Sequence, residues 1–199
     1  MKKISGGALI TKILIQNGIS KAFCVPGESY LGVLEAIRES KNKFDLVVCR
    51  HEGGAAYMAE AYGRLTKKPG ICFVTRGPGA CNASIGVHTA QQEGTPLILF
   101  VGQVPVKSLK KNAFQSIDTD KFFNSMAKYT ETIKDPKNIR KILEKAIYIS
   151  TEGKPGPVIL AIPEDIQFAM VSDKISEVLE NKTHKIKSKI FRTYIKELN

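Results

Sequence analysis

The sequence has few of the residues that mark a metal site or a disulfide framework. Its 199 residues include three histidines and four cysteines, and no two cysteines form a C-x-x-C pair. This scarcity argues against a zinc site, a thioredoxin-like motif and a histidine-based metal site. No apolar run approaches the roughly 20 residues that cross a bilayer, and the first residues show no signal-peptide pattern. We therefore expect a cytoplasmic protein with reduced thiols, no metal ligands of its own and no membrane partner.

Acidic residues are scarce relative to basic ones. The chain has 30 Lys and Arg against 19 Asp and Glu, a net charge of +11. Such an excess can serve nucleic acid or an anionic surface. The lysines, however, are spread between apolar stretches, and no compact basic and aromatic motif appears. We interpret the charge as a lysine-rich surface and expect no nucleic-acid partner.

Short apolar runs alternate with segments that have helical spacing. Runs that are apolar at consecutive positions are typical of strands buried on both faces, and their alternation with helices indicates a parallel sheet. The sequence therefore predicts an α/β fold of three layers, α/β/α, with a mostly parallel sheet of about six strands. The expected strands are 22–25, 44–49, 71–75, 97–101, 128–133 and 158–162, and the expected helices are 8–16, one capped by Ser29, 53–65, 80–92 and 136–151.

Three turns each follow an expected strand: Pro26-Gly27, Arg50-His51-Glu52 and Gly77-Pro78-Gly79. In open α/β sheets, ligands bind at the edge formed by the carboxyl ends of the strands. Glu52 opens a helix, where an anion is favoured. The two glycines after it lower helix stability, which suggests close approach of a ligand, for example a flat ring. By position alone, Glu52 could also be a helix-start acid with no further role.

Familiar ligand motifs fail on single residues. A dinucleotide fingerprint needs glycine where Asn82 stands, and no G-K-[ST] follows the glycines. A zincin motif needs histidine where Ala55 stands. Residues 102–120 form the longest irregular stretch, which indicates a functional or mobile loop. From Ala169 the apolar pattern thins, so we expect a domain over residues 1–168 and, over 169–199, a polar tail or the start of an absent central domain.

Taken in order, several segments resemble the N-terminal pyrimidine-binding (PYR) domain of acetolactate synthase-type enzymes, which depend on thiamine diphosphate. The resemblance runs from about Ser5 to Asp165. The segments are Phe23-Cys24-Val25-Pro26-Gly27, Arg50-His51-Glu52-Gly53-Gly54-Ala55-Ala56, Ala59-Glu60-Ala61-Tyr62-Gly63-Arg64, Thr75-Arg76-Gly77-Pro78-Gly79-Ala80-Cys81-Asn82, Val101-Gly102-Gln103, Ala113-Phe114-Gln115 and Pro155-Gly156-Pro157-Val158.

The resemblance implies a chemistry and a set of roles. The catalytic carboxylate would be Glu52, hydrogen-bonded to N1′ of the pyrimidine ring and promoting its imino tautomer. The substrate would be a small 2-oxoacid such as pyruvate, decarboxylated and joined to a second carbonyl compound. The residues matching the lining of the pyrimidine ring and the active-site mouth are Pro26, Gly27, Pro78, Asn82 and Gln115, and those matching positions near the reacting substrate are Phe114 and Lys128.

The sequence departs from this family in two ways. Glu28-Ser29 follows Pro26-Gly27 where acetolactate synthases usually continue with glycine, which resembles relatives of uncertain substrate, so the resemblance does not imply that acetolactate is the product. The Gly-Asp-Gly segment that holds Mg²⁺ and the diphosphate in the family's second thiamine domain is absent, as is the central domain that carries FAD. We therefore expect Mg²⁺ and FAD only through other domains, a homodimer or a partner chain carrying the diphosphate-binding domain, and an inactive isolated chain. Two alternatives stay open: a natural subunit of a two-chain 2-oxoacid decarboxylase, and a non-catalytic interaction module.

Overall fold

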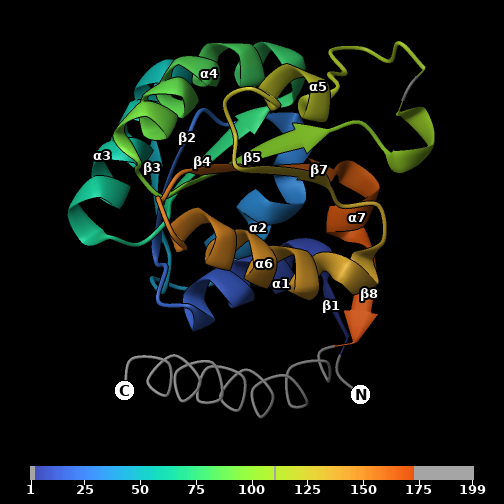
Figure 1. Ribbon diagram of the computed structural model, residues 1–199. Coiled ribbons are helices and arrows are strands. Elements are labelled where there is room, and N and C mark those ends of the chain that lie inside the picture. Colours follow the sequence, from blue (N-terminus) through green and yellow to red (C-terminus); the bar gives the residue numbers. More distant parts are fainter. Residues whose placement is uncertain (1–2, 110, 173–199) are drawn as a thin grey trace, which may run out of the picture.

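Six parallel strands form the centre of the molecule (Figure 1). The computed structural model describes residues 3–109 and 111–172. The strand order is β3-β2-β4-β5-β7-β6, which confirms the predicted parallel sheet. The strands are β2 (Lys21–Cys24), β3 (Asp45–Val48), β4 (Gly70–Thr75), β5 (Leu97–Gln103), β6 (Tyr129–Thr132) and β7 (Pro157–Pro163).

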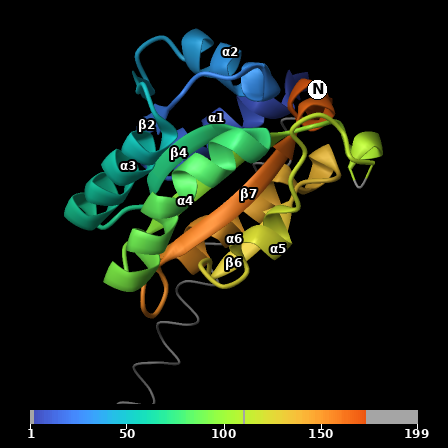
Figure 2. The same ribbon diagram turned by 90° about the horizontal axis from the view of Figure 1, so that it is seen from above.

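Helices cover both faces of this sheet, so the predicted three layers are present (Figure 1). One face is covered by α1 (Gly6–Gln16), α2 (Leu31–Glu39) and α6 (Ile139–Thr151), which share one apolar cluster with the strands. The other face is covered by α3 (Glu52–Thr66) and α4 (Arg76–Glu93), which form the second cluster. Figure 2 shows α3 and α4 lying beside each other over the sheet. Short helices complete the chain: η1 (Glu28–Tyr30), η2 (Val106–Ser108), α5 (Thr119–Phe123), η3 (Pro136–Asn138) and α7 (Glu164–Phe168).

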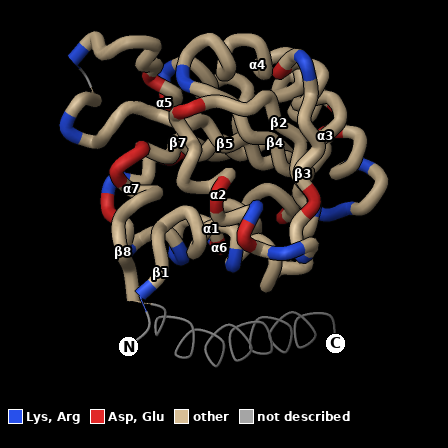
Figure 3. The backbone as a smooth tube through the Cα atoms, turned by 180° about the vertical axis from the view of Figure 1, so that it is seen from behind, with Lys and Arg blue, Asp and Glu red and all other residues tan. Residues whose placement is uncertain are grey.

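The central strands β4, β5 and β7 carry no charged residue, and Figure 3 shows Lys, Arg, Asp and Glu on the surrounding helices and loops. Both faces of these strands are buried, as their continuous apolar runs predict. Phe73 of β4 stacks on Phe100 of β5 with ring centroids 4.7 Å apart, and on Tyr30 of η1. This aromatic stack fixes η1 against the sheet.

Two helix starts differ from the prediction. Ser29 does not cap a helix; it is buried within η1, and its Oγ lies 2.7 Å from Thr75 Oγ1. Close packing explains this, because a Cβ on Gly102 would come within 2.2 Å of Ser29 Oγ. Helix α4 begins at Arg76 rather than near residue 80. Its first turn tolerates Pro78, because the N–H that proline lacks would have no intrahelical partner there.

A separate pair of antiparallel strands joins the two ends of the described chain. In β1 (Lys3–Ser5) and β8 (Met170–Ser172), Lys3 pairs with Ser172 and Ser5 with Met170. Strand β8 thus lies at the beginning of the segment 169–199, for which the sequence predicts a polar tail or the start of a central domain. Three residues alternating between exposed Met170 and buried Val171 carry too little pattern to be read as a strand from sequence. The rest of the expected 169–199 segment lies outside the described residues.

Candidate active site at the carboxyl edge of the sheet

Glu52 and Asn82 meet where α3 and α4 begin. His51 ends the loop after β3 and caps α3, its Nδ1 accepting a hydrogen bond of 3.0 Å from the Gly53 N–H. Glu52 follows His51 and is the first residue of α3, where it is half-buried. Asn82 Nδ2 donates to Glu52 Oε2 over 2.9 Å. Among the described residues, Oε1 of Glu52 has no hydrogen-bond partner, so one carboxylate oxygen is positioned and the other is available.

Small residues bring the two helices together closely enough for this contact. A Cβ on Gly86 of α4 would stand 2.5 Å from the Cβ of Ala56 of α3, closer than packed carbons approach. The helix interface is otherwise built from buried alanines and one valine: Ala55, Ala59, Ala83, Val87 and Ala90. The spacing between Glu52 and Asn82 thus follows from side-chain size along α3 and α4.

The two glycines after Glu52 have different surroundings. A Cβ on Gly53 would meet His51 Nδ1 at 3.1 Å and the Asn82 carbonyl oxygen at 3.3 Å, so packing within the chain explains this glycine. A Cβ on Gly54 would meet nothing within 4 Å. Gly54 therefore leaves an exposed stretch of helix backbone beside Glu52, although glycine in a helix costs about 0.5–1 kcal/mol relative to alanine.

Pro26, Gly27 and Pro78 lie at the same edge, because the strands before them are parallel to β3. Gly27 packs against the end of β4, where its Cβ would stand 2.6 Å from the Thr75 Cβ. Pro26 and Pro78 are exposed. The structure thus brings these residues to the edge that holds Glu52, as the loop positions predict.

Gln115 and Phe114 belong to a loop that lies over the start of α4. The Gln115 carbonyl accepts a hydrogen bond of 2.8 Å from the Gly77 N–H, and Gln115 has a left-handed φ of 59°. Phe114 is 74% exposed. The buried side chain of Gln103, at the end of β5, anchors the same loop through Nε2, which donates to the Ile117 carbonyl over 2.9 Å. Gln103 belongs to one of the segments that resemble the family, but the sequence did not predict this positioning role. The feature that could have indicated it is a side-chain amide at the end of an otherwise apolar strand.

Arg76 links three loops at this edge and was also missed. Its buried guanidinium pairs with Glu164, after β7, and lies 3.7 Å from a carboxylate oxygen of Glu28, after β2. Its backbone has a left-handed φ of 30°, and its Nε has no partner among the described residues. Arg76 therefore ties together the ends of β2, β4 and β7.

Beneath the edge, ionisable groups are held neutral. Burial raises the pKa of the Cys24 thiol to about 11. Burial also raises the pKa of Tyr30, whose hydroxyl donates a hydrogen bond to the Val25 carbonyl. The floor below the site is thus uncharged at neutral pH.

Lys128 does not join the other predicted site residues. It precedes β6 and lies at the amino edge of the sheet, opposite Glu52. Its Nζ donates to the carbonyls of Ile149 and Glu152, over 2.6 and 2.7 Å, at the end of α6. Hydrogen bonding to helix-end carbonyls accounts for this lysine, so the structure does not bring it together with Glu52, and the predicted role near the substrate gains no support from its position.

The site offers acid–base chemistry from one carboxyl group rather than metal ligation. Over residues 3–109 and 111–172, no cluster of three His, Cys, Asp or Glu side chains could hold a metal ion. No helix of the same part is long and apolar enough to cross a membrane. A carboxyl group with one available oxygen beside open backbone can exchange a proton with a ring nitrogen lying on that backbone.

Comparison with known proteins gives consistent matches. The family described as "Thiamine pyrophosphate enzyme, N-terminal TPP binding domain" matches residues 4–122. Acetolactate synthase of Schizosaccharomyces pombe, mitochondrial, is 33% identical over 94% of this chain and 30% of its own length. The mitochondrial acetolactate synthase catalytic subunit of Saccharomyces cerevisiae is 34% identical over 86% of the chain and 25% of its own length. Acetolactate synthase of Bacillus subtilis is 35% identical over 82% and 28%. The chain thus spans about a quarter to a third of these relatives.

Proposed function

Because the chain belongs to the thiamine pyrophosphate enzyme family, as its N-terminal TPP-binding domain, we propose that the edge around Glu52 binds the aminopyrimidine ring of thiamine diphosphate. The available Oε1 of Glu52 carries this proposal. A ring nitrogen can reach that oxygen while the ring covers the open backbone at Gly54. The other residues proposed for the lining are Pro26, Gly27, Pro78, Asn82 and Gln115.

Glu52 is proposed to hold and return the proton at N1′ of the ring. Its carboxyl group stands in the first turn of α3, and the Asn82 amide fixes its orientation. When bound, thiamine diphosphate supplies an electron sink for the carbon left by loss of CO₂ from a 2-oxoacid. Asn82 keeps Glu52 pointed at the ring, and Phe114, exposed on the loop over α4, is the proposed contact to substrate.

The proposed reaction is that of an acetolactate synthase-like lyase or transferase acting on pyruvate-like 2-oxoacids. The relatives' names support this activity, although the chain covers only a part of each. We propose that the diphosphate group, Mg²⁺ and any FAD are held by other domains, in a homodimer or in a partner chain, and that the cytoplasm is the compartment. A subunit of a two-chain 2-oxoacid decarboxylase would use the same residues in the same way.

The test is reconstitution with a diphosphate-binding domain, followed by measurement of CO₂ release from pyruvate and other 2-oxoacids. Glu52→Gln keeps the size and the contact to Asn82 but cannot exchange the proton, so kcat should fall by roughly 10²–10⁴. Glu35→Gln, at an exposed acid on α2, is the matched control and should leave kcat unchanged. Near-normal turnover of Glu52→Gln would remove Glu52 from the mechanism.

The chain alone, with thiamine diphosphate and Mg²⁺, should release no CO₂. Robust turnover by the pure chain would overturn the shared-site part of the proposal. If the reconstituted protein binds thiamine diphosphate but converts no 2-oxoacid, the interaction-module alternative is favoured instead.

A further inference from the structure

A pocket of about 450 Å³ lies between α1 and α2, on the layer opposite to α3 and α4. Its buried base is formed by Thr11 of α1 and Ala36 of α2, with Ala8 and Ile15 beside them. The turn between α2 and β3 closes the pocket toward the amino edge of the sheet. The volume lies within the range of small-molecule sites in proteins.

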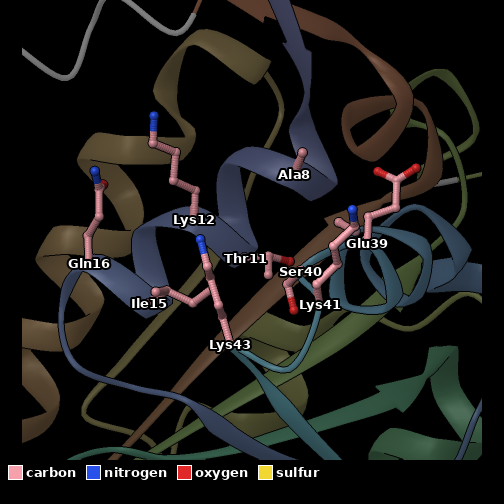
Figure 4. A pocket seen from close by; sticks show the side chains of 10 residues that line it. Ala8, Thr11, Lys12, Ile15, Gln16, Glu39, Ser40, Lys41 and Lys43 are labelled. Carbon is pink, nitrogen blue, oxygen red and sulfur yellow. The ribbon is translucent and has the colours of Figure 1, made fainter.

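Lysines surround the opening of this pocket. Figure 4 shows the side chains of Lys12, from α1, and of Lys41 and Lys43, from the turn after α2. In the described part of the chain, neither Lys41 nor Lys43 forms an ion pair. Glu39 is the one acidic residue of the lining. The opening therefore attracts an anion, while the base offers apolar contact.

The turn that carries these lysines keeps an uncommon backbone conformation. Lys41 and the following Asn42 have φ angles of 48° and 68°, both left-handed. This conformation costs a residue such as lysine about 1 kcal/mol, whereas glycine would adopt it freely. A lysine at this position is thus present despite its backbone preference, and it adds positive charge at the opening.

We propose that this pocket binds a compact organic anion, a carboxylate or sulfonate on an apolar body, at a site separate from the thiamine edge. The anionic group contacts Lys41 and Lys43, and the apolar body rests on Thr11 and Ala36. No residue of the pocket belongs to the proposed cofactor site, so the two proposals stand or fall separately.

The experiment is a titration of the ¹⁵N-labelled full chain with naphthalene-2-sulfonate, followed by two-dimensional NMR. Saturable shifts should gather at the amides of Thr11, Ala36 and Ser40 and spare Gly54. The double variant Lys41→Ala/Lys43→Ala should weaken binding roughly tenfold, because two charge contacts are lost. The variant Ala8→Leu, which fills the pocket without changing charge, should also weaken it.

Matched controls separate a built site from general attraction to a basic protein. Lys107→Ala/Lys137→Ala removes the same charge at exposed positions on η2 and η3 and should leave the affinity unchanged. Neutral naphthalene-2-sulfonamide and inorganic phosphate should both bind more weakly than the sulfonate. Equal loss in both double variants, phosphate binding as tight as the sulfonate, or shifts centred outside the pocket would overturn the proposal. Glu52→Gln should bind the sulfonate normally, whatever its effect on turnover.

Discussion

The two carboxylate oxygens of Glu52 have different surroundings, because Asn82 donates a hydrogen bond to one of them. One oxygen accepts a hydrogen bond from the Asn82 amide of α4, and the other has no hydrogen-bond partner among the described residues. The chain therefore fixes the carboxylate in the absence of any ligand, which lowers the ordering cost of binding one. Packing within the chain does not require glycine at position 54, because a Cβ there would meet no atom within 4 Å. A substitution that adds a side chain at Gly54 therefore tests whether the free space serves a ligand.

Replacing Gly54 by alanine should raise the free energy of unfolding by about 0.5–1 kcal/mol, because helix propensity improves and the new Cβ meets no atom. The same change should weaken thiamine diphosphate binding in the reconstituted protein, since the methyl group occupies the face proposed for the ring. Urea denaturation and a cofactor titration measure the two effects. Gly53→Ala is the control and should bring no such stabilisation, because its Cβ meets His51 and Asn82.

Removing Arg76 should be far more damaging than removing an exposed arginine. In Arg76→Ala, Glu164 loses its partner and the loops after β2 and β7 lose their link to β4. We expect a loss of about 2–3 kcal/mol, because a half-buried carboxylate is left unpaired. Arg38→Ala breaks an exposed pair with Glu35 and should change stability little. Equal urea midpoints for the two variants would show that Arg76 does not link these loops.

At the scale of elements, the site is a product of how α3 and α4 pack. Glycine and alanine along the contact let the helix axes approach, and this approach places Asn82 against Glu52. The loop at residues 113–117 adds a cover to the start of α4 through Gly77 and Gln103. The close packing of α3 and α4 thus positions Glu52 and Asn82, and the loop covers the same end of α4.

Widening that pair should disturb both stability and site. Gly86→Ala places a Cβ 2.5 Å from the Ala56 Cβ and 2.8 Å from its carbonyl carbon. We expect a loss of about 1–3 kcal/mol from overpacking, despite the better helix propensity of alanine. His88→Ala, at an exposed position of the same helix, is the control for substitution in α4. Chemical denaturation of both variants is the measurement; unchanged stability of Gly86→Ala would show that the helices can separate freely.

At the scale of the whole molecule, the core buries two thiols and one phenol hydroxyl in their neutral forms. Burial raises the pKa of Cys24 from 9.0 to about 11 and raises the pKa values of Cys72 and Tyr30. Their contribution to stability is full below pH 9. For Cys24 it is lost as the pH rises from 9 toward 11, because the unfolded chain then releases a proton that the folded chain keeps; for Cys72 and Tyr30 the loss continues at higher pH.

The free energy of unfolding should therefore fall between pH 9 and pH 11, by about 2 kcal/mol for Cys24 alone. Urea denaturation over this range is the measurement. Cys24→Ala should have a shallower fall, while Cys81→Ala, at an exposed thiol, should keep the full slope. A stability that holds or rises above pH 9 would contradict the assignment.

The sequence predicted most of this architecture for a physical reason. Continuous apolar runs such as Leu97–Val101 specify strands buried on both faces, and alternation with helices specifies the parallel sheet. The sheet edge that holds Glu52 could be predicted from the positions at which the expected strands end. What could not be predicted depends on contacts distant in sequence: the hydrogen bond of Gln103 to the Ile117 carbonyl, the ion pairs of Arg76, and the displacement of Lys128 to the far edge.

The pairing of β1 with β8 has a consequence for synthesis. Lys3–Ser5 leave the ribosome well before their partners Met170–Ser172, which emerge only after the whole six-stranded sheet has been translated. Until then β1 is a strand without a neighbour, open to a chaperone or to another nascent chain. Closing this pair therefore has to wait for β8, and it brings the two ends of the described chain together. A chain cut and rejoined there would keep its sheet intact.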